Sequence, residues 1–201
     1  AMTPFFLKRI SARPLLFSVD CRNRLVTEHI ESGFEAVFLK DGNIVRAGKG
    51  VEKIIASIDE IPITFGGKAR CNIENSLAAV AALVGLGVDH VTIRKGLTTF
   101  RADTTTNPGR FNIFRIGDIT VMIDYGHNPA GYRAVIDMIK SFNAASYTGV
   151  IGVPGDRKDE MIHEVGSICG KFFSKLYIKE DNDLRGRNAG EVADILYNAA
   201  I

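Results

Sequence analysis

A carboxylate, an imidazole and an amide occur together in the segment VMIDYGHNPAGY, residues 121 to 132, where a run of apolar residues ends. Asp124 follows the apolar run, and His127 comes three residues later, directly before Asn128 and Pro129. A carboxylate at the end of a buried strand can accept hydrogen bonds from ribose hydroxyls, and a nearby imidazole can contact a phosphate or its metal. The same residues also suit a structural corner, in which Asp124 caps the next helix and His127 lies on the surface. The spacing therefore indicates either a nucleotide site or a helix cap.

Two further segments carry side chains suited to a nucleotide. NPGR, residues 107 to 110, presents Arg110 after a tight turn, at the start of a strand that should pair beside the strand ending at Asp124. A guanidinium held there could bind phosphate oxygens in a bidentate manner, although a solvated arginine after a turn also fits. CNIENSLAA places Asn72 and Asn75 at a helix start, where one could cap the helix and the other could contact a base edge.

Two loops rich in glycine or charge follow later strands. GVPGDRKDE, residues 152 to 160, is a strand-to-helix turn whose amides and Arg157 could form an anion pocket. KEDNDLRGR, residues 179 to 187, mixes three acids with two arginines, so it could clamp a small zwitterion or remain solvated. No glycine run matches G-x-x-x-x-G-K-[ST], so the sequence lacks the usual cradle for β- and γ-phosphates.

The composition fits a globular protein with one large domain or two small ones. The 201 residues are 46% hydrophobic and 24% charged, and the net charge of +2 gives no reason to expect nucleic acid as the main partner. The three cysteines are widely spaced, so we expect neither a disulfide framework nor a metal site. No apolar stretch approaches about 18 residues, which predicts a cytoplasmic protein without a membrane span or signal peptide. The opening Ala1-Met2 is typical of a residue added before a start, so we expect a piece of a longer chain.

Short strands and turns should fill the first sixty residues, followed by helices. Residues 33 to 48 predict a hairpin that turns at Asp41-Gly42, a dipeptide suited to positive φ angles. Apolar residues at steps of three and four predict a helix over 72 to 86, and a shorter helix should follow over 91 to 100. Residues 101 to 110 are rich in threonine, proline and glycine, which favours an exposed connection between domains.

The remainder of the chain alternates strands and helices. Residues 110 to 125 predict a hairpin that turns at Gly117-Asp118. Further strands are expected over 148 to 153 and 175 to 180, and helices over 130 to 142, 158 to 173 and 189 to 200. This alternation predicts βαβ units in a mainly parallel sheet, with functional sites at the carboxyl ends of the strands.

Taken in order, NIENSLAA, NPGR and DYGHNP resemble motifs of the ATP-dependent Mur ligase superfamily, which includes peptidoglycan amino-acid-adding enzymes and folylpolyglutamate synthase. Together with IPITFGGKARCNIENSLAA, GRFNIF, DYGHNPAGY, GVPGDRKDE and KEDNDLRGR, they are similar to the C-terminal, Mur-ligase-like region of the cyanophycin synthetase family. This resemblance extends over nearly the whole chain.

The resemblance implies a role for each matching residue. Asn75 would contact adenine, Arg110 would approach the phosphates, and Asp124 and His127 would contact the ribose and phosphate region. In cyanophycin synthetases the incoming amino acid is arginine, which is joined to aspartate side chains of a polyaspartate backbone. Its expected contacts lie in the two later loops, at Asp156, Arg157, Asp181, Asp183 and Arg185.

The resemblance also implies a domain division and an activity. Residues 1–107 would be the C-terminal portion of a central ATPase domain, and 108–201 an incomplete Rossmann-like domain. The phosphate loop and the Mg²⁺ ligands are expected outside this chain, so the chain alone should be inactive. Within a longer enzyme it would serve an ATP- and Mg²⁺-dependent amide-bond ligase that acts through an acyl phosphate. The alternatives are a separate nucleotide- or amino-acid-binding module without catalysis, or another Mur-type ligase related to folylpolyglutamate synthase; a homo-oligomer is also compatible with the sequence.

Overall fold

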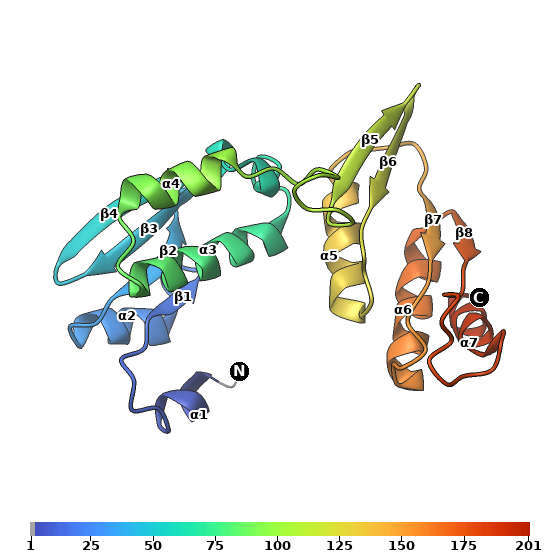
Figure 1. The fold of residues 1–201 in the computed structure, drawn as a ribbon, viewed down its shortest axis with the longest axis horizontal. Coiled ribbons are helices and arrows are strands. Elements are labelled where there is room, and N and C mark those ends of the chain that lie inside the picture. The colour runs from blue at the N-terminus through green and yellow to red at the C-terminus, as the bar shows by residue number, and fades with distance from the viewer. Residues whose placement is uncertain (1–2) are drawn as a thin grey trace. The chain divides into compact units, whose positions relative to one another are not determined.

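The computed structural model describes residues 3–201 and has an α/β fold, as the sequence predicted (Figure 1). Ala1 and Met2 lie outside the described residues. The chain divides into two compact units, which we call unit 1 (Ala1–Arg101) and unit 2 (Ala102–Ile201). Among the helices described in residues 3–201, none is long and apolar enough to cross a membrane.

Unit 1 contains a four-stranded sheet in the order β1-β2-β3-β4. Its strands are β1 (Leu16–Ser18), β2 (Ala36–Lys40), β3 (Asn43–Gly48) and β4 (Val51–Ser57), and its helices are α1 (Thr3–Leu7), α2 (Arg24–Glu31), α3 (Arg70–Gly85) and α4 (His90–Thr99). Only the β1–β2 pair is parallel among these strands. The predicted hairpin is confirmed, because β2 and β3 are joined at Asp41 and Gly42, which have φ angles of 48° and 72°.

The core of unit 1 lies between the sheet and helices α3 and α4 (Figure 1). Leu77 and Val80 of α3 are fully buried against sheet residues that include Val37 and Ile44. Helix α4 packs on β4 through Ile93. Because the apolar residues of both helices face the sheet, the remaining faces of α3 and α4 are free to carry polar groups.

Unit 2 alternates strands and helices, as expected from its sequence. Its elements are β5 (Asn112–Ile116), β6 (Ile119–Ile123), α5 (Pro129–Lys140), β7 (Thr148–Ile151), α6 (Asp159–Phe172), β8 (Lys175–Ile178) and α7 (Glu191–Ala200). Strands β5 and β6 form an antiparallel hairpin, and β7 and β8 form a parallel pair.

The expected mainly parallel sheet of unit 2 is therefore two separate two-stranded sheets. Within residues 3–201, β6 has no parallel neighbour. Parallel strands are normally covered on both faces, but Ile119 and Ile123 of β6 remain 66% and 51% exposed. Strand β6 therefore lacks the burial that a parallel neighbour would give, and it pairs only with β5 among the described strands.

The core of unit 2 is formed by β7, β8, α6 and α7. Ile162 and Val165 of α6 and Leu196 of α7 are fully buried there. The two helices approach closely at Gly166, where an added Cβ would lie 2.5 Å from the Leu196 carbonyl oxygen. This core fixes the carboxyl ends of β7 and β8, where two of the predicted site loops begin.

Candidate functional site

Asp124 directly follows β6 and holds the start of the hairpin. Its Oδ2 atom accepts a 3.2 Å hydrogen bond from the amide of Phe111, a residue with a φ angle of 48°. Burial raises the pKa of Asp124 above its ordinary value, while the Phe111 amide and the charges of Arg110 and His127 act in the opposite direction. Asp124 therefore lies in a partly desolvated position with cationic groups nearby.

Asn128, and not Asp124, caps helix α5. The Asn128 Oδ1 atom accepts a 2.8 Å hydrogen bond from the Gly131 amide, and Pro129 occupies the first turn. The Nδ1 atom of His127 lies 3.2 Å from the Tyr125 carbonyl oxygen. Because a carbonyl can only accept a hydrogen bond, this contact places a ring proton on Nδ1. The cap is thus supplied by Asn128, which leaves the second carboxylate oxygen of Asp124 available.

The turn that carries Arg110 is organised by a buried amide that the sequence did not single out. Asn112 is only 2% exposed; its Oδ1 accepts a 2.7 Å bond from the Gly109 amide, and its Nδ2 donates to the carbonyls of Ala102, Asn107 and Arg110. The Gly109 carbonyl in turn accepts a 2.7 Å bond from the Tyr125 amide. These bonds fix the backbone of the turn and leave the Arg110 side chain exposed.

Asn75 lies in unit 1, on α3, and neither asparagine caps that helix. Helix α3 begins at Arg70, two residues earlier than predicted, after Ala69, which makes no side-chain cap. Asn72 donates a 2.7 Å hydrogen bond to the Ile63 carbonyl, and its Oδ1 accepts a 3.3 Å bond from Asn75. The interpretation of either residue as a helix cap is therefore wrong.

A pocket of about 510 Å³ lies beside Asn75, lined by residues between Ile63 and Phe100 of unit 1. Its lining is mostly apolar and includes Ala79, Leu83 and Leu97, with Asn75 among its few polar groups. Binding sites for small molecules are typically apolar pockets with a few polar groups that fix orientation. The pocket therefore has the size and the chemistry to take a flat heterocycle.

The loops after β7 and β8 are joined by ion pairs. Arg185 donates a 2.8 Å hydrogen bond to Asp156, and it lies 3.9 Å from Asp183. Asp156 is also 3.8 Å from Arg157, and its pKa is lowered chiefly by the bond from Arg185. Asp181 lies 3.3 Å from Lys179. Four of the five residues predicted to bind an amino acid thus form one charged cluster, and Asp181 pairs with a neighbouring lysine.

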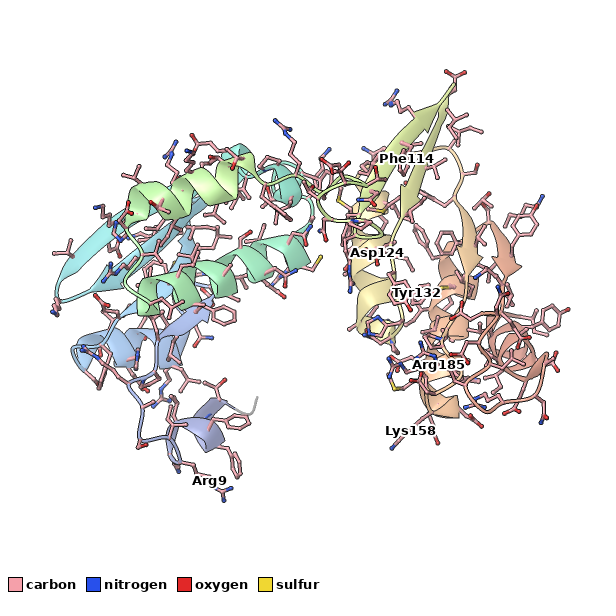
Figure 2. All side chains as sticks on the ribbon, viewed as in Figure 1. Arg9, Phe114, Asp124, Tyr132, Lys158 and Arg185 are labelled. Atoms are coloured by element: carbon pink, nitrogen blue, oxygen red, sulfur yellow. The ribbon has the colours of Figure 1, made fainter. Side chains whose placement is uncertain are left out.

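The ends of β6, β7 and β8 approach one another in unit 2. Tyr132 of α5 donates a 2.7 Å hydrogen bond to the Gly152 carbonyl after β7, and it lies near Gly126 of the loop after β6. Tyr125 is close enough to Arg185 to contribute to raising the pKa of that arginine. Figure 2 labels Asp124, Tyr132 and Arg185, which are drawn one below another in unit 2.

Three residues that organise the site were absent from the sequence prediction: Asn112, Tyr132 and Arg187. Tyr132 and Arg187 bond to backbone groups 20 to 32 residues away, whereas Asn112 bonds to backbone groups within ten residues. The only sequence signal is the presence of a bulky polar side chain in a segment of turns or at a helix start. That signal is weak because such residues are usually solvated.

No group of three or more histidine, cysteine or acidic side chains within residues 3–201 is placed to hold a metal ion. The clustered carboxylates are already bonded to cations, as Asp156 is to Arg185. The described donor set therefore does not fit Mg²⁺, and none of these residues is assigned as its ligand.

Comparison with known proteins identifies relatives of the chain. Residues 109–200 match the family described as the Mur ligase, glutamate ligase domain. Cyanophycin synthetase of Crocosphaera subtropica is 36% identical over 96% of this chain and 22% of its own length, and that of Synechocystis is 38% identical over 94% and 21%. A UDP-N-acetylmuramoyl-L-alanyl-D-glutamate–2,6-diaminopimelate ligase of Prochlorococcus marinus is 30% identical over 76% of this chain and 30% of its own length.

Solved structures show the same fold. Folylpolyglutamate synthase of Thermotoga maritima gives a TM-score of 0.57 at 19% identity, covering 94% of this chain and 46% of that protein. MurF of Acinetobacter baumannii gives the same score at 16% identity, covering 96% of this chain and 42% of that protein. The chain spans only about a fifth of the length of the cyanophycin synthetases that it matches. The predicted resemblance is confirmed, and the chain carries a Mur ligase, glutamate ligase domain in residues 109–200.

Proposed function

We propose that this chain supplies nucleotide- and amino-acid-binding groups to an ATP-dependent ligase that joins arginine to aspartate side chains of a polyaspartate backbone. The similarity to cyanophycin synthetases over 94–96% of the chain carries the proposal. In this scheme residues 1–107 belong to the central ATPase domain and 108–201 to the C-terminal domain. The unit boundary after Arg101 and the family match from residue 109 lie on either side of that division, which supports it.

Each unit carries groups that suit part of a nucleotide. In unit 1 the pocket beside Asn75 suits the adenine ring, because its apolar walls can stack on the base while the amide bonds to its edge. In unit 2 Asp124 would accept from the ribose hydroxyls, and Arg110 and His127 would contact phosphate oxygens. The exposed side chain of Arg110 supports a contact with phosphate. Asp124 does not cap helix α5, which supports a bond from its carboxylate to the ribose.

The amino acid would be bound by the charged cluster of the two later loops. A zwitterion offers a carboxylate to Arg157 or Arg185 and an ammonium group to Asp156, Asp181 or Asp183. The ion pair between Asp156 and Arg185 supports this role. Both side chains are partly exposed, so each can give up its partner and bind a charged group of the ligand instead.

The proposed reaction has two balanced steps. A side-chain carboxylate of the polyaspartate substrate attacks the γ-phosphate of ATP, forming an acyl phosphate and releasing ADP. The neutral amino group of arginine then attacks the acyl carbon and the C–N bond forms. The C–O bond breaks, and phosphate leaves with its electron pair and takes up the proton that the nitrogen loses. This chain's own residues contribute positioning and charge stabilisation.

The experiment that tests this function measures phosphate release by the enzyme that carries this chain. ATP, L-arginine and a polyaspartate primer should together give phosphate and a primer whose mass grows by arginine residues. Omission of either L-arginine or primer should abolish both signals. Phosphate release that depends on another amino acid instead would replace arginine in the proposal, and no dependence on any amino acid would overturn the ligase function.

A second candidate is a binding module without catalysis. The absence of a phosphate-loop motif from these 201 residues favours it for the chain alone. In that case the purified chain should bind ATP weakly, with a Kd no tighter than high micromolar, and should not hydrolyse it. Isothermal titration of the chain with ATP, alongside an ADP-release assay, measures both quantities.

A further inference from the structure

The Arg187 side chain makes four hydrogen bonds within unit 2. Its Nε donates a 2.7 Å bond to the Gly155 carbonyl, and its Nη2 donates 2.7 Å and 2.6 Å bonds to the Arg157 carbonyl and to Asp159. Its Nη1 bonds to Glu191 at 2.6 Å. The side chain is only 15% exposed, and its bonds to Gly155, Arg157 and Glu191 are partly buried, so they fix its planar guanidinium in one orientation.

The bonded carbonyls flank a single residue of the charged cluster. Gly155 and Arg157 lie on either side of Asp156, so Arg187 holds the backbone on both sides of that carboxylate. The loop from residue 183 to 187 also approaches Gly155 so closely that a Cβ there would overlap the Leu184 carbonyl oxygen. The two loops are thus locked together through backbone atoms, independently of the ion pair between their side chains.

The other partner of that ion pair is held in an uncommon conformation. Arg185 has a φ angle of 49°, in the left-handed region that non-glycine residues rarely occupy, and Gly186 follows at 87°. The Arg185 amide donates a 3.0 Å bond to Asp183 Oδ1, and its guanidinium bonds to Asp156. Because Arg187 fixes the end of this turn, it also limits where the Arg185 side chain can lie.

We infer that Arg187 is a positioning residue that presents Asp156 and Arg185 to the amino-acid substrate, through its bonds to the backbone on both sides of Asp156. The inference rests on the proposed function, because that function makes the charged cluster the amino-acid site. Arg187 does not need to touch the substrate, since four of its five N–H donors already bond to protein acceptors.

The test compares variants of the enzyme that carries this chain, with L-arginine and ATP varied separately. Arg187→Met should raise the KM for L-arginine at least tenfold and leave the KM for ATP within twofold. Arg187→Lys should not rescue the KM, because one ammonium group cannot bond to both carbonyls in the geometry of the fork. Hydrogen exchange of the amides of residues 155 to 158 should become faster in both variants.

The matched control is Arg133→Met. Arg133 of helix α5 bonds at 2.7 Å to Glu164 of helix α6, away from the charged cluster. Its substitution should change neither KM. Should Arg187→Met fail to fold, Asp159→Asn gives a milder test, because Asp159 is 67% exposed and supplies only one of the contacts. It should raise the KM for L-arginine with an unchanged melting temperature.

Two results would overturn the inference. A lower melting temperature with equal changes in both KM values would show that Arg187 serves the fold alone. An effect of Asp156→Asn on the KM for L-arginine, without any effect of the Arg187 variants, would leave the proposed function standing and reject the positioning role. Loss of L-arginine dependence from the unaltered enzyme would instead remove the proposed function and this inference together.

Discussion

The hydroxyl of Tyr132 makes two hydrogen bonds with the backbone of Gly152: it donates to the carbonyl at 2.7 Å and accepts from the amide at 3.2 Å. Tyr132 is the fourth residue of helix α5, which follows the Asp124 corner, and Gly152 begins the loop that carries Asp156. The side chain therefore ties the predicted nucleotide corner to the predicted amino-acid loop. Burial raises the pKa of Tyr132 to about 12, so the hydroxyl keeps its proton at physiological pH.

Tyr132→Phe should lower the free energy of unfolding by about 1–3 kcal/mol, because it leaves a part-buried amide and carbonyl without their partner. Urea denaturation followed by circular dichroism measures the change. Tyr197→Phe is the control, since Tyr197 is exposed and should change stability by less than about 0.5 kcal/mol. Equal effects of the two substitutions would show that the Gly152 contact contributes no stability.

Asp124→Asn separates a nucleotide role from a structural one. The amide oxygen can still accept from Phe111, and the removal of a partly buried charge should leave the melting temperature unchanged or slightly higher. If Asp124 binds ribose, the loss of a charge-assisted bond of about 1.5–3 kcal/mol should raise the KM for ATP roughly 10- to 150-fold. Steady-state kinetics of the enzyme that carries this chain, with ATP varied, gives the value.

Asn128→Ala provides the contrasting variant at the same corner. Loss of the bond to the Gly131 amide should lower the free energy of unfolding by about 0.5–2 kcal/mol. The melting temperature should fall while the KM for ATP stays close to that of the unaltered enzyme. A raised melting temperature would contradict the capping role of Asn128, and an unchanged KM in Asp124→Asn would make Asp124 a purely structural residue.

Gly166→Ala should reverse the usual effect of this substitution in a helix. Alanine normally stabilises a helix interior by about 1 kcal/mol relative to glycine, but here the new methyl group would lie 2.5 Å from the Leu196 carbonyl oxygen. Separation of α6 and α7 should cost about 1–3 kcal/mol. Gly96→Ala in α4 is the control, because no atom lies within 4 Å of its added Cβ, and it should be stabilising. Thermal denaturation of both variants measures the difference in sign.

The stability of unit 1 should decrease at mildly acidic pH because of His90. The His90 Nε2 atom accepts a 3.0 Å bond from Arg46, and burial followed by Lys53 and Arg46 lowers the pKa of His90 from 6.5. Asp89 and Glu35 act in the opposite direction without reversing the shift. The unfolded chain therefore binds more protons, and the free energy of unfolding is highest above about pH 6.5 and falls as the pH decreases below it.

Urea denaturation at several pH values between 5 and 8 tests this dependence. One proton sets an upper limit of about 1.4 kcal/mol per pH unit, and solvent screening lowers the slope below that limit. His90→Gln should remove this contribution. An unchanged slope in that variant would assign the pH dependence to other groups.

Local sequence signals predicted much of the fold because they act over a few residues. Asp41-Gly42 sets its predicted hairpin through positive φ angles. Helix α5 was predicted from residue 130, but its cap is Asn128 and not Asp124. The predicted pairing of the strand after Arg110 with the strand before Asp124 brings Arg110, Asp124 and His127 near one another. The structure contains this pairing, between β5 and β6.

The remaining features depend on contacts that local patterns do not encode. Arg187 bonds to carbonyls about thirty residues away, and Asn112 is buried by a turn that precedes it. The separation of β6 from β7 depends on tertiary burial, which strand propensity does not report. The role of Asn72 was misread because the helix begins at Arg70, and helix boundaries are set within one or two residues by local competition.

The separate cores of the two units have a thermodynamic consequence. Val37, Leu77 and Ile93 share one apolar cluster, and Ile162 and Leu196 share another, with no member in common. Cooperativity arises within a shared core, so each unit should melt as its own transition in calorimetry. A ligand bound by one unit alone would then raise only that unit's midpoint, so L-arginine, proposed to bind in unit 2, should raise the midpoint of unit 2 and leave that of unit 1 unchanged.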